Sequence, residues 1–327
     1  MNQATIFRAR IRFRVAMRFN VTEAEVSLVL VGYRATLSAE KLETAIRDSH
    51  WLVLRIYGLE SEQVAHEVGG RVKLACDVAS VANRLGLDSG SDAATDRAAD
   101  AVKAHVLQAT GVVLRDNVHG LDVYPETPES CTLASDVRVE GYMNAQPFLS
   151  MVEDLSRAPM ELSRETRDVV LLLNYALMRS EPESRIVYAF SAVEMLGQNE
   201  QWSECQSELL DSLATAARNM TYATAEEREE VAQAIERGAH RLSLRQGVMR
   251  LLDRLQLAAL RNEWDRLYGR RSELVHGLVP QPGVSYVALA DEVVCLCGYI
   301  LLTAVGKEVP GVMAHRDVHF PVTAGAG

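Results

Sequence analysis

The 327-residue sequence has few cysteines, and their spacing excludes the common kinds of zinc site. Five are present, no CxxC pair occurs, and the pair Cys295 and Cys297 has no second pair to complete a ligand set. We therefore expect reduced, mostly buried thiols. Aromatic residues make up only 6% of the chain, too few for a sheet of rings that stack on nucleic-acid bases.

Positive charge and long apolar runs are also scarce. The net charge of −10 argues against a protein coated for non-specific nucleic-acid binding, although it allows a local basic site. The nearest candidate for a membrane span, 293–305, is shorter than the ~18 residues required. Residues 1–14 alternate apolar with basic side chains and lack the continuous apolar block of a signal peptide. These absences favour a cytoplasmic protein with no membrane partner.

Residues 1–142 are expected to form a small α+β domain. Apolar residues alternate with arginines along 6–15, which is typical of a strand with one face in water. The pair Gly69–Gly70 weakens the middle of the helix that follows the strands. The expected elements after the first strand are strands at 26–31 and 51–57, a helix over 60–86, a loop at 86–95, a helix over 98–109 and strands within 112–123.

Residues 143–309 are expected to form an all-helical bundle, followed by a C-terminal tail at 310–327. Apolar residues recur at helical spacing almost throughout this part. Pro280 and Pro282 break the chain before the last helix. The predicted helices cover 146–157, 162–179, 184–197, 203–219, 225–237, 244–254, 258–276 and 286–305.

An unexpected cation lies on the apolar face of the helix predicted over 258–276. Arg271 projects into this face, and a buried cation needs a carboxylate or another strong acceptor. His276 ends the helix, where the helix dipole favours imidazolium and a general acid is useful. The apolar face consists of Leu260, Trp264, Leu267 and Leu274.

The helix predicted over 184–197 carries an unexpected anion. Glu194 falls inside its apolar face, so the economical inference is that Glu194 meets Arg271. The alternative is a buried ion pair that only fixes the register of the two helices. The apolar face consists of Ile186, Val187, Phe190 and Val193.

The segment from Tyr268 to Gly277, YGRRSELVHG, resembles the RxxxxH motif of HEPN domains, specifically of the ApeA-like type. The segment 185–196 resembles the earlier helix of that family, which carries an acidic residue in an apolar stretch. The resemblance covers roughly 145–307, and the first 140 residues resemble an accessory domain often seen before such modules.

The resemblance implies a helical bundle that forms a homodimer or higher homo-oligomer, with one composite cleft. It implies a metal-independent, cofactor-free endoribonuclease of a bacterial defence or toxin type, with RNA as substrate and a defence-system partner bound through residues 1–142. Arg271 would bind the scissile phosphate, His276 would transfer protons as the ribose 2′-hydroxyl attacks, and Glu194 would orient Arg271. The implied substrate-binding residues are Arg266, Tyr268, Arg270 and Ser272.

Two other functions stay open at this stage. Ser272 follows Arg271, where many active members have Asn, Asp or His. A catalytically inactive HEPN module would bind RNA, a nucleotide or a protein partner, and a purely structural interaction protein would bind only proteins. RNA cleavage in the presence and absence of EDTA discriminates between these readings.

Arginines concentrate between residues 241 and 271. Eight arginines and three acidic residues give this window a balance of +5 within an acidic chain. Such a strip can supply phosphate contacts. The alternative is a surface strip that forms salt bridges with the acidic run at 226–236.

Overall fold

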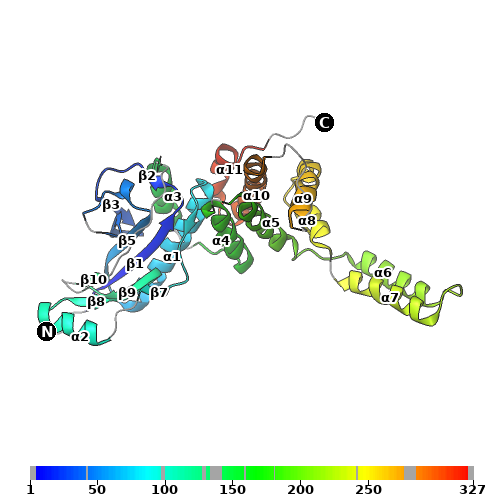
Figure 1. Cartoon of the computed structure of the whole chain (residues 1–327), viewed down its shortest axis with the longest axis horizontal. Helices are drawn as coiled ribbons and strands as arrows, with labels where there is room; N and C mark the ends of the chain where they lie inside the picture. Colours follow the sequence, from blue (N-terminus) through cyan, green and yellow to red (C-terminus); the bar gives the residue numbers. More distant parts are fainter. Residues whose placement is uncertain are drawn as a thin grey trace.

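The computed structural model of the protein describes residues 5–41, 43–96, 100–126, 130–132, 142–157, 160–179, 181–240, 242–275 and 285–322. An antiparallel sheet region spans residues 7–125, and a helical region follows it (Figure 1). The predicted order of an α+β part and then a helical bundle is confirmed.

The strand pairs of the main sheet are antiparallel. The strand β4 is not predicted from the sequence, because small residues such as Ala35 and Ser38 interrupt its apolar run. The strand order is β3 (Glu25–Leu30), β4 (Tyr33–Ala39), β5 (Trp51–Leu59), β1 (Phe7–Val15), β9 (Asn117–Pro125) and β7 (Ala93–Asp96), and β6 (Leu87–Asp88) also pairs with β1. Smaller elements are β2 (Arg18–Phe19), the 3-10 turn η1 (Ile46–Asp48), α2 (Asp100–Thr110), β8 (Val113–Arg115), β10 (Ser130–Thr132) and β11 (Tyr142–Met143).

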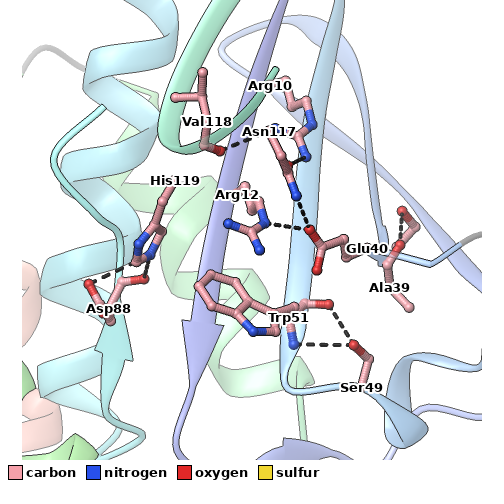
Figure 2. A network of polar contacts seen from close by, with 11 residues as sticks. Arg10, Arg12, Ala39, Glu40, Ser49, Trp51, Asp88, Asn117, Val118 and His119 are labelled. Atoms are coloured by element: carbon pink, nitrogen blue, oxygen red, sulfur yellow. Dashed lines mark hydrogen bonds and ion pairs between the residues drawn. The ribbon is translucent and has the colours of Figure 1, made fainter. Parts of the chain in front are cut away.

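Two arginines of β1 are buried, which corrects the expectation of a strand with one face in water. Arg10 is 1% exposed and Arg12 is 4% exposed. Arg12 Nε donates to Glu40 Oε1 at 2.5 Å, and Asn117 Nδ2 donates to the same oxygen at 2.6 Å. The Arg12 guanidinium also lies 3.7 Å from the centre of the Trp51 ring (Figure 2). These partners neutralise and cover the charge that would otherwise require water.

Helix α1 (Glu62–Ala82) packs against β1 and β9 of the sheet. The Ser61 hydroxyl caps its N-terminus by accepting from the backbone N–H of Val64 at 3.2 Å. Gly69 lets the helix approach the sheet closely, because a Cβ there would lie 2.5 Å from Leu121 Cδ1. This glycine therefore has a packing role that offsets its low helix propensity.

Helix α1 also carries a buried carboxyl group. Asp77 is only 5% exposed. Burial raises the pKa of this carboxyl from 3.8 to about 7, and the Ser89 hydroxyl and the Lys73 ammonium offset only part of that effect. The neighbouring carboxylates of Asp88 and Asp92 raise the pKa further.

We predict that Asp77 makes the free energy of unfolding fall as the pH rises from about 4 to about 7. In that window the folded chain keeps the Asp77 proton, whereas the unfolded chain, with a pKa of 3.8, has released it. This contribution is fully present below pH ~4 and is lost as the pH passes the folded-state pKa, by up to about 4 kcal/mol.

Urea unfolding of wild type and Asp77→Asn between pH 4 and pH 8 measures this contribution. The variant should become more stable relative to wild type as the pH rises. Asp211→Asn, at an exposed position of the helical region, is the control and should show no such trend. A constant difference between wild type and Asp77→Asn across this range would contradict the prediction.

The helices of the second half begin and end within a few residues of the predicted bounds. In Figure 1, α6 and α7 form a hairpin that extends away from the rest of the helical region. The helices are α3 (Gln146–Ser156), α4 (Arg164–Met178), α5 (Pro182–Gly197), α6 (Glu204–Arg218), α7 (Ala225–His240), α8 (Leu244–Arg254), α9 (Arg261–Val275) and α10 (Tyr286–Glu308), with a 3-10 turn η2 (Ala258–Leu260) before α9.

The segment that follows α10 differs from the expected tail. A 3-10 turn η3 (Pro310–Val312) and a short helix α11 (Met313–His319) fold back onto α10. Phe320 is fully buried against Gly298, where a Cβ would lie 2.3 Å from the Phe320 ring. The sequence does not predict this contact, because a single aromatic side chain, Phe320, forms it and the apolar periodicity fades after residue 310.

Helix α10 is the apolar centre of the helical region, and it contacts α4, α5 and α11. Within the described part of the chain, it is the one helix long and apolar enough to cross a membrane by length and composition. Its most apolar window has a mean hydropathy of 1.8, and 61% of that window is buried inside the protein. The core helix of a folded bundle has the same properties.

The two parts of the chain share one continuous apolar core, in which α1 contacts both α3 and α4. Asn174 of α4 is fully buried at this contact. Its Oδ1 accepts from Ser80 Oγ at 2.7 Å and from the backbone N–H of Leu87 at 3.1 Å, while its Nδ2 donates to the carbonyl of Asp77 at 3.1 Å. This amide satisfies buried polar groups of α1 and β6 together.

Candidate functional site

Helices α5 and α9 bring the two unexpected charges together. Their apolar faces are as predicted, except that Val187 is 37% exposed and does not belong to the face of α5. Arg271 Nη2 donates to Glu194 Oε2 at 3.4 Å, so the predicted ion pair is present. The Glu194 side chain is 6% exposed and that of Arg271 is 19% exposed. We call these two residues the Glu194–Arg271 pair.

The pair is incompletely satisfied. It is joined by one contact, whereas a guanidinium and a carboxylate commonly form two parallel hydrogen bonds. Glu194 Oε1 and Arg271 Nε are both buried, and neither has a hydrogen-bond partner among the described residues. Buried polar atoms without a partner are rare and destabilising. The pair therefore retains one acceptor and one donor that the fold does not use.

Burial dominates the electrostatics of the pair. It raises the pKa of Glu194 above its ordinary value, although the charge of Arg271 and the neighbouring Tyr268 hydroxyl oppose this rise. Burial and the charge of Glu194 also raise the pKa of Tyr268. On the α10 side, burial and then the same carboxylate raise the pKa of Cys297 well above normal. Cys297 is therefore a buried thiol and not a nucleophile.

Three aromatic rings hold α9 against α5. Phe190 makes edge-on contacts with Trp264 and Tyr268, with ring centres 4.9 and 5.9 Å apart. Trp264 and Tyr268 stack at 6.0 Å, and the Arg271 guanidinium lies 5.7 Å from the Tyr268 ring. The rings fix the position of Tyr268 beside the pair. The sequence pattern places Phe190 and Trp264 on facing apolar stripes but does not indicate that they touch.

Two glycines set the position of α5 relative to α8. A Cβ on Gly247 would lie 2.3 Å from the carbonyl oxygen of Gly197, and a Cβ on Gly197 would lie 2.9 Å from Val248. The backbones therefore approach more closely here than any larger residue allows. This contact holds the C-terminal end of α5, which carries Glu194.

The other predicted site residues differ in what surrounds them. Tyr268, Arg270 and Ser272 are half-buried on α9. Arg266 Nη2 lies 2.7 Å from Glu263 Oε1 and 2.6 Å from Glu292 Oε2, so two carboxylates already occupy it. His276 lies outside the described residues and directly follows the last residue of α9.

The arginines between residues 241 and 271 are largely paired with nearby carboxylates. Arg245 lies 2.6 Å from Asp265, and Arg254 lies 2.6 Å from Glu200. Glu229 and Glu236 of the acidic run at 226–236 bind Arg218, which lies outside the strip. The described arginines of the strip are thus largely salt-bridged, as the alternative predicts, and the carboxylates named here as their partners lie outside the acidic run. Phosphate contacts by this strip would require these carboxylates to be displaced.

Among the described residues, no group of three or more His, Cys, Asp or Glu side chains is placed to hold a metal ion. No protein-family model, curated protein or solved structure matches the chain.

The chemistry available to the site therefore follows from the side chains of the Glu194–Arg271 pair. A guanidinium with a free donor can bind a phosphate oxygen, and the neighbouring carboxylate can hold that guanidinium in place.

Proposed function

We propose that the protein is a metal-independent endoribonuclease that cleaves RNA through attack of the ribose 2′-hydroxyl. In this proposal Arg271 binds the scissile phosphate and stabilises its developing charge. Glu194 orients Arg271 and does not touch the substrate. His276 transfers protons between the attacking and leaving oxygens. The reaction uses no cofactor, and it is of a kind suited to bacterial defence or toxin systems.

The observation that carries the proposal is the incomplete satisfaction of the Glu194–Arg271 pair. An ion pair kept only for stability would gain from a second hydrogen bond, or from replacement by apolar side chains. Here Arg271 Nε and Glu194 Oε1 have no hydrogen-bond partner in the part of the chain that the structure describes, and Arg271 is the more exposed member. A free guanidinium donor beside a fixed carboxylate suits a phosphate ligand.

The proposal includes a homodimer with one composite site. At helical spacing, residues 271 and 276 of the sequence would point in different directions, so a single copy would present one phosphate-binding group and one proton-transfer group apart from each other. Two copies meeting through α9 supply both groups to one cleft. Tyr268, Arg270 and Ser272 would then contact RNA. Arg266 could bind a phosphate only after releasing the carboxylates of Glu263 and Glu292.

The burial of the pair also favours a second candidate, a catalytically inactive module that binds RNA, a nucleotide or a protein partner. Only 19% of the Arg271 side chain is exposed, and an arginine held this way can bind without catalysis. A partner of a defence system would bind through residues 1–142 in either case. RNA cleavage discriminates between the two candidates.

We predict that the purified protein cleaves single-stranded RNA and that cleavage persists in EDTA. The side chains supply the charge and the protons, so removal of divalent cations should leave the rate within about twofold. DNA of the same sequence should survive because it lacks the attacking hydroxyl. Cleavage that stops in EDTA and returns with added Mg²⁺ would contradict the proposed mechanism. RNA that binds and stays intact would support the inactive module instead.

A further inference from the structure

A second site with unused polar groups lies beside α1, far in sequence from the Glu194–Arg271 pair. A cavity of about 670 Å³ opens between α1, the loop after β6 and α4. A volume in this range is typical of pockets for small organic ligands. We call this cavity the α1 pocket.

Two buried polar groups that line the α1 pocket have no hydrogen-bond partner among the described residues. Asp77 is 5% exposed and lines the cavity, and its Oδ1 makes no hydrogen bond with any described residue. Ser89 is 1% exposed and lines the same cavity; its hydroxyl lies close enough to lower the pKa of the Asp77 carboxyl, but it too makes no hydrogen bond with a described residue. A buried carboxyl oxygen and a hydroxyl left without hydrogen bonds destabilise a fold. A ligand with N–H donors would satisfy Asp77, and its acceptor would satisfy Ser89.

The α1 pocket also carries arginines that no carboxylate of the described residues neutralises. Arg71 Nε and Nη2 are buried and have no hydrogen-bond partner within the described ranges, and Arg167 of α4 lines the same cavity. The remaining cation, Lys73, is occupied by Asp92 Oδ1 at 2.5 Å and by the Gly90 carbonyl at 2.9 Å. Both arginines therefore offer guanidinium donors to an anionic group in the cavity.

Gly70 borders the α1 pocket and, unlike Gly69, has no packing role. Gly70 lies in the middle of α1, where glycine is less stable than alanine by about 1 kcal/mol. A Cβ there would meet no atom within 4 Å, unlike a Cβ on the neighbouring Gly69. Gly70 lines the cavity. A larger side chain at this position would extend into the cavity.

The spacing of these groups sets the size of the ligand. Arg71 and Asp77 are six residues apart on α1, which is about 9 Å along the helix axis. A single small anion cannot span that distance. Apolar side chains of Met160 and Leu171 also line the cavity and can pack against a flat ring.

We propose that the α1 pocket binds a small planar ligand with an attached anionic group, which is the chemistry of a mononucleotide. The anionic group lies at Arg71 and Arg167, and the hydrogen-bonding edge of the ring lies at Asp77 and Ser89. Above the folded-state pKa of Asp77, about 7, a guanine ring fits best among the bases, because two adjacent N–H donors on one edge match the two oxygens of the ionised carboxylate. This site is independent of the proposed ribonuclease activity.

Isothermal titration calorimetry of the full chain with GMP tests the proposal. We expect saturable binding below about 1 mM, with guanosine and inorganic phosphate each at least about tenfold weaker. Asp77→Asn and Arg71→Met should each weaken GMP binding by about tenfold or more. Gly70→Leu should abolish it by filling the cavity while the helix still folds. Arg164→Met, which removes an exposed arginine of α4, should leave binding unchanged.

Three results would overturn the proposal. One is the absence of saturable GMP binding, and another is GMP binding that survives Gly70→Leu. The third is inorganic phosphate binding as tightly as GMP, because the end of the pocket at Asp77 would then be unused. Thermal unfolding of each variant must show a single transition like that of wild type, so that a loss of binding reports on the pocket.

Discussion

Replacing His276 with alanine is expected to lower the rate of RNA cleavage by about 10²–10⁴-fold, the usual contribution of general acid–base catalysis. Folding should be retained, since the residue directly follows the end of α9 and we expect it to contribute little to the core. Single-turnover cleavage of an end-labelled RNA measures the loss, and thermal unfolding of the same preparation checks the fold.

His105→Ala is a matched control for this variant. His105 is an exposed histidine of α2, in the sheet region of the chain, and its loss should leave cleavage unchanged. RNA binding should survive in both variants because the imidazole is assigned to proton transfer. Undiminished cleavage by rigorously repurified His276→Ala protein would remove histidine from the mechanism and favour the inactive binding module.

Arg271→Met is expected to lower the free energy of unfolding by roughly 3–5 kcal/mol, because it leaves Glu194 buried without a counterion. Glu194 is 5% exposed, so water cannot replace the lost partner. The effect should be smaller at pH 5 than at pH 8. The pKa of Glu194 is already raised by burial, and a protonated carboxyl needs no counterion. Urea unfolding at the two pH values measures both effects.

The double variant Glu194→Gln with Arg271→Met should recover much of this loss, since neither charge is then buried alone. Arg164→Met breaks the exposed contact with Asp168 and should change stability by less than about 0.5 kcal/mol. A double variant no more stable than Arg271→Met would show that the two side chains are not coupled.

The variant Arg271→Lys keeps the positive charge and loses the planar guanidinium, so it separates the loss of activity from the loss of stability.

The helical half of the fold is predictable because its apolar residues repeat at helical spacing over long segments. The ends of α5, α8 and α10 follow from this period and from the flanking Ser, Pro and Gly residues. Strand β4 is not predictable in the same way, because its buried residues include Thr36 and Ser38, which do not stand out as apolar. The same limit applies to Phe320, whose burial depends on the glycine at position 298.

Long-range polar contacts divide into those that the sequence reveals and those that it hides. Glu194 and Arg271 each interrupt an apolar stripe, so both are visible as anomalies and their pairing follows from charge. The burial of Arg12 is hidden because β1 alternates like an ordinary surface strand, and Glu40 gives no sign that it lies opposite. Asp77 interrupts the apolar run ACDVASVA and offers the same signal as Glu194.

The ends of the RNA products test the central claim most directly. Mass spectrometry of a short RNA incubated with the protein in EDTA should find a 2′,3′-cyclic phosphate or a 3′-phosphate on the upstream fragment. The downstream fragment should carry a 5′-hydroxyl, because the 2′-hydroxyl is the nucleophile. Fragments with a 3′-hydroxyl and a 5′-phosphate would contradict the account, since they require water as the nucleophile and leave Arg271 and His276 without their assigned roles.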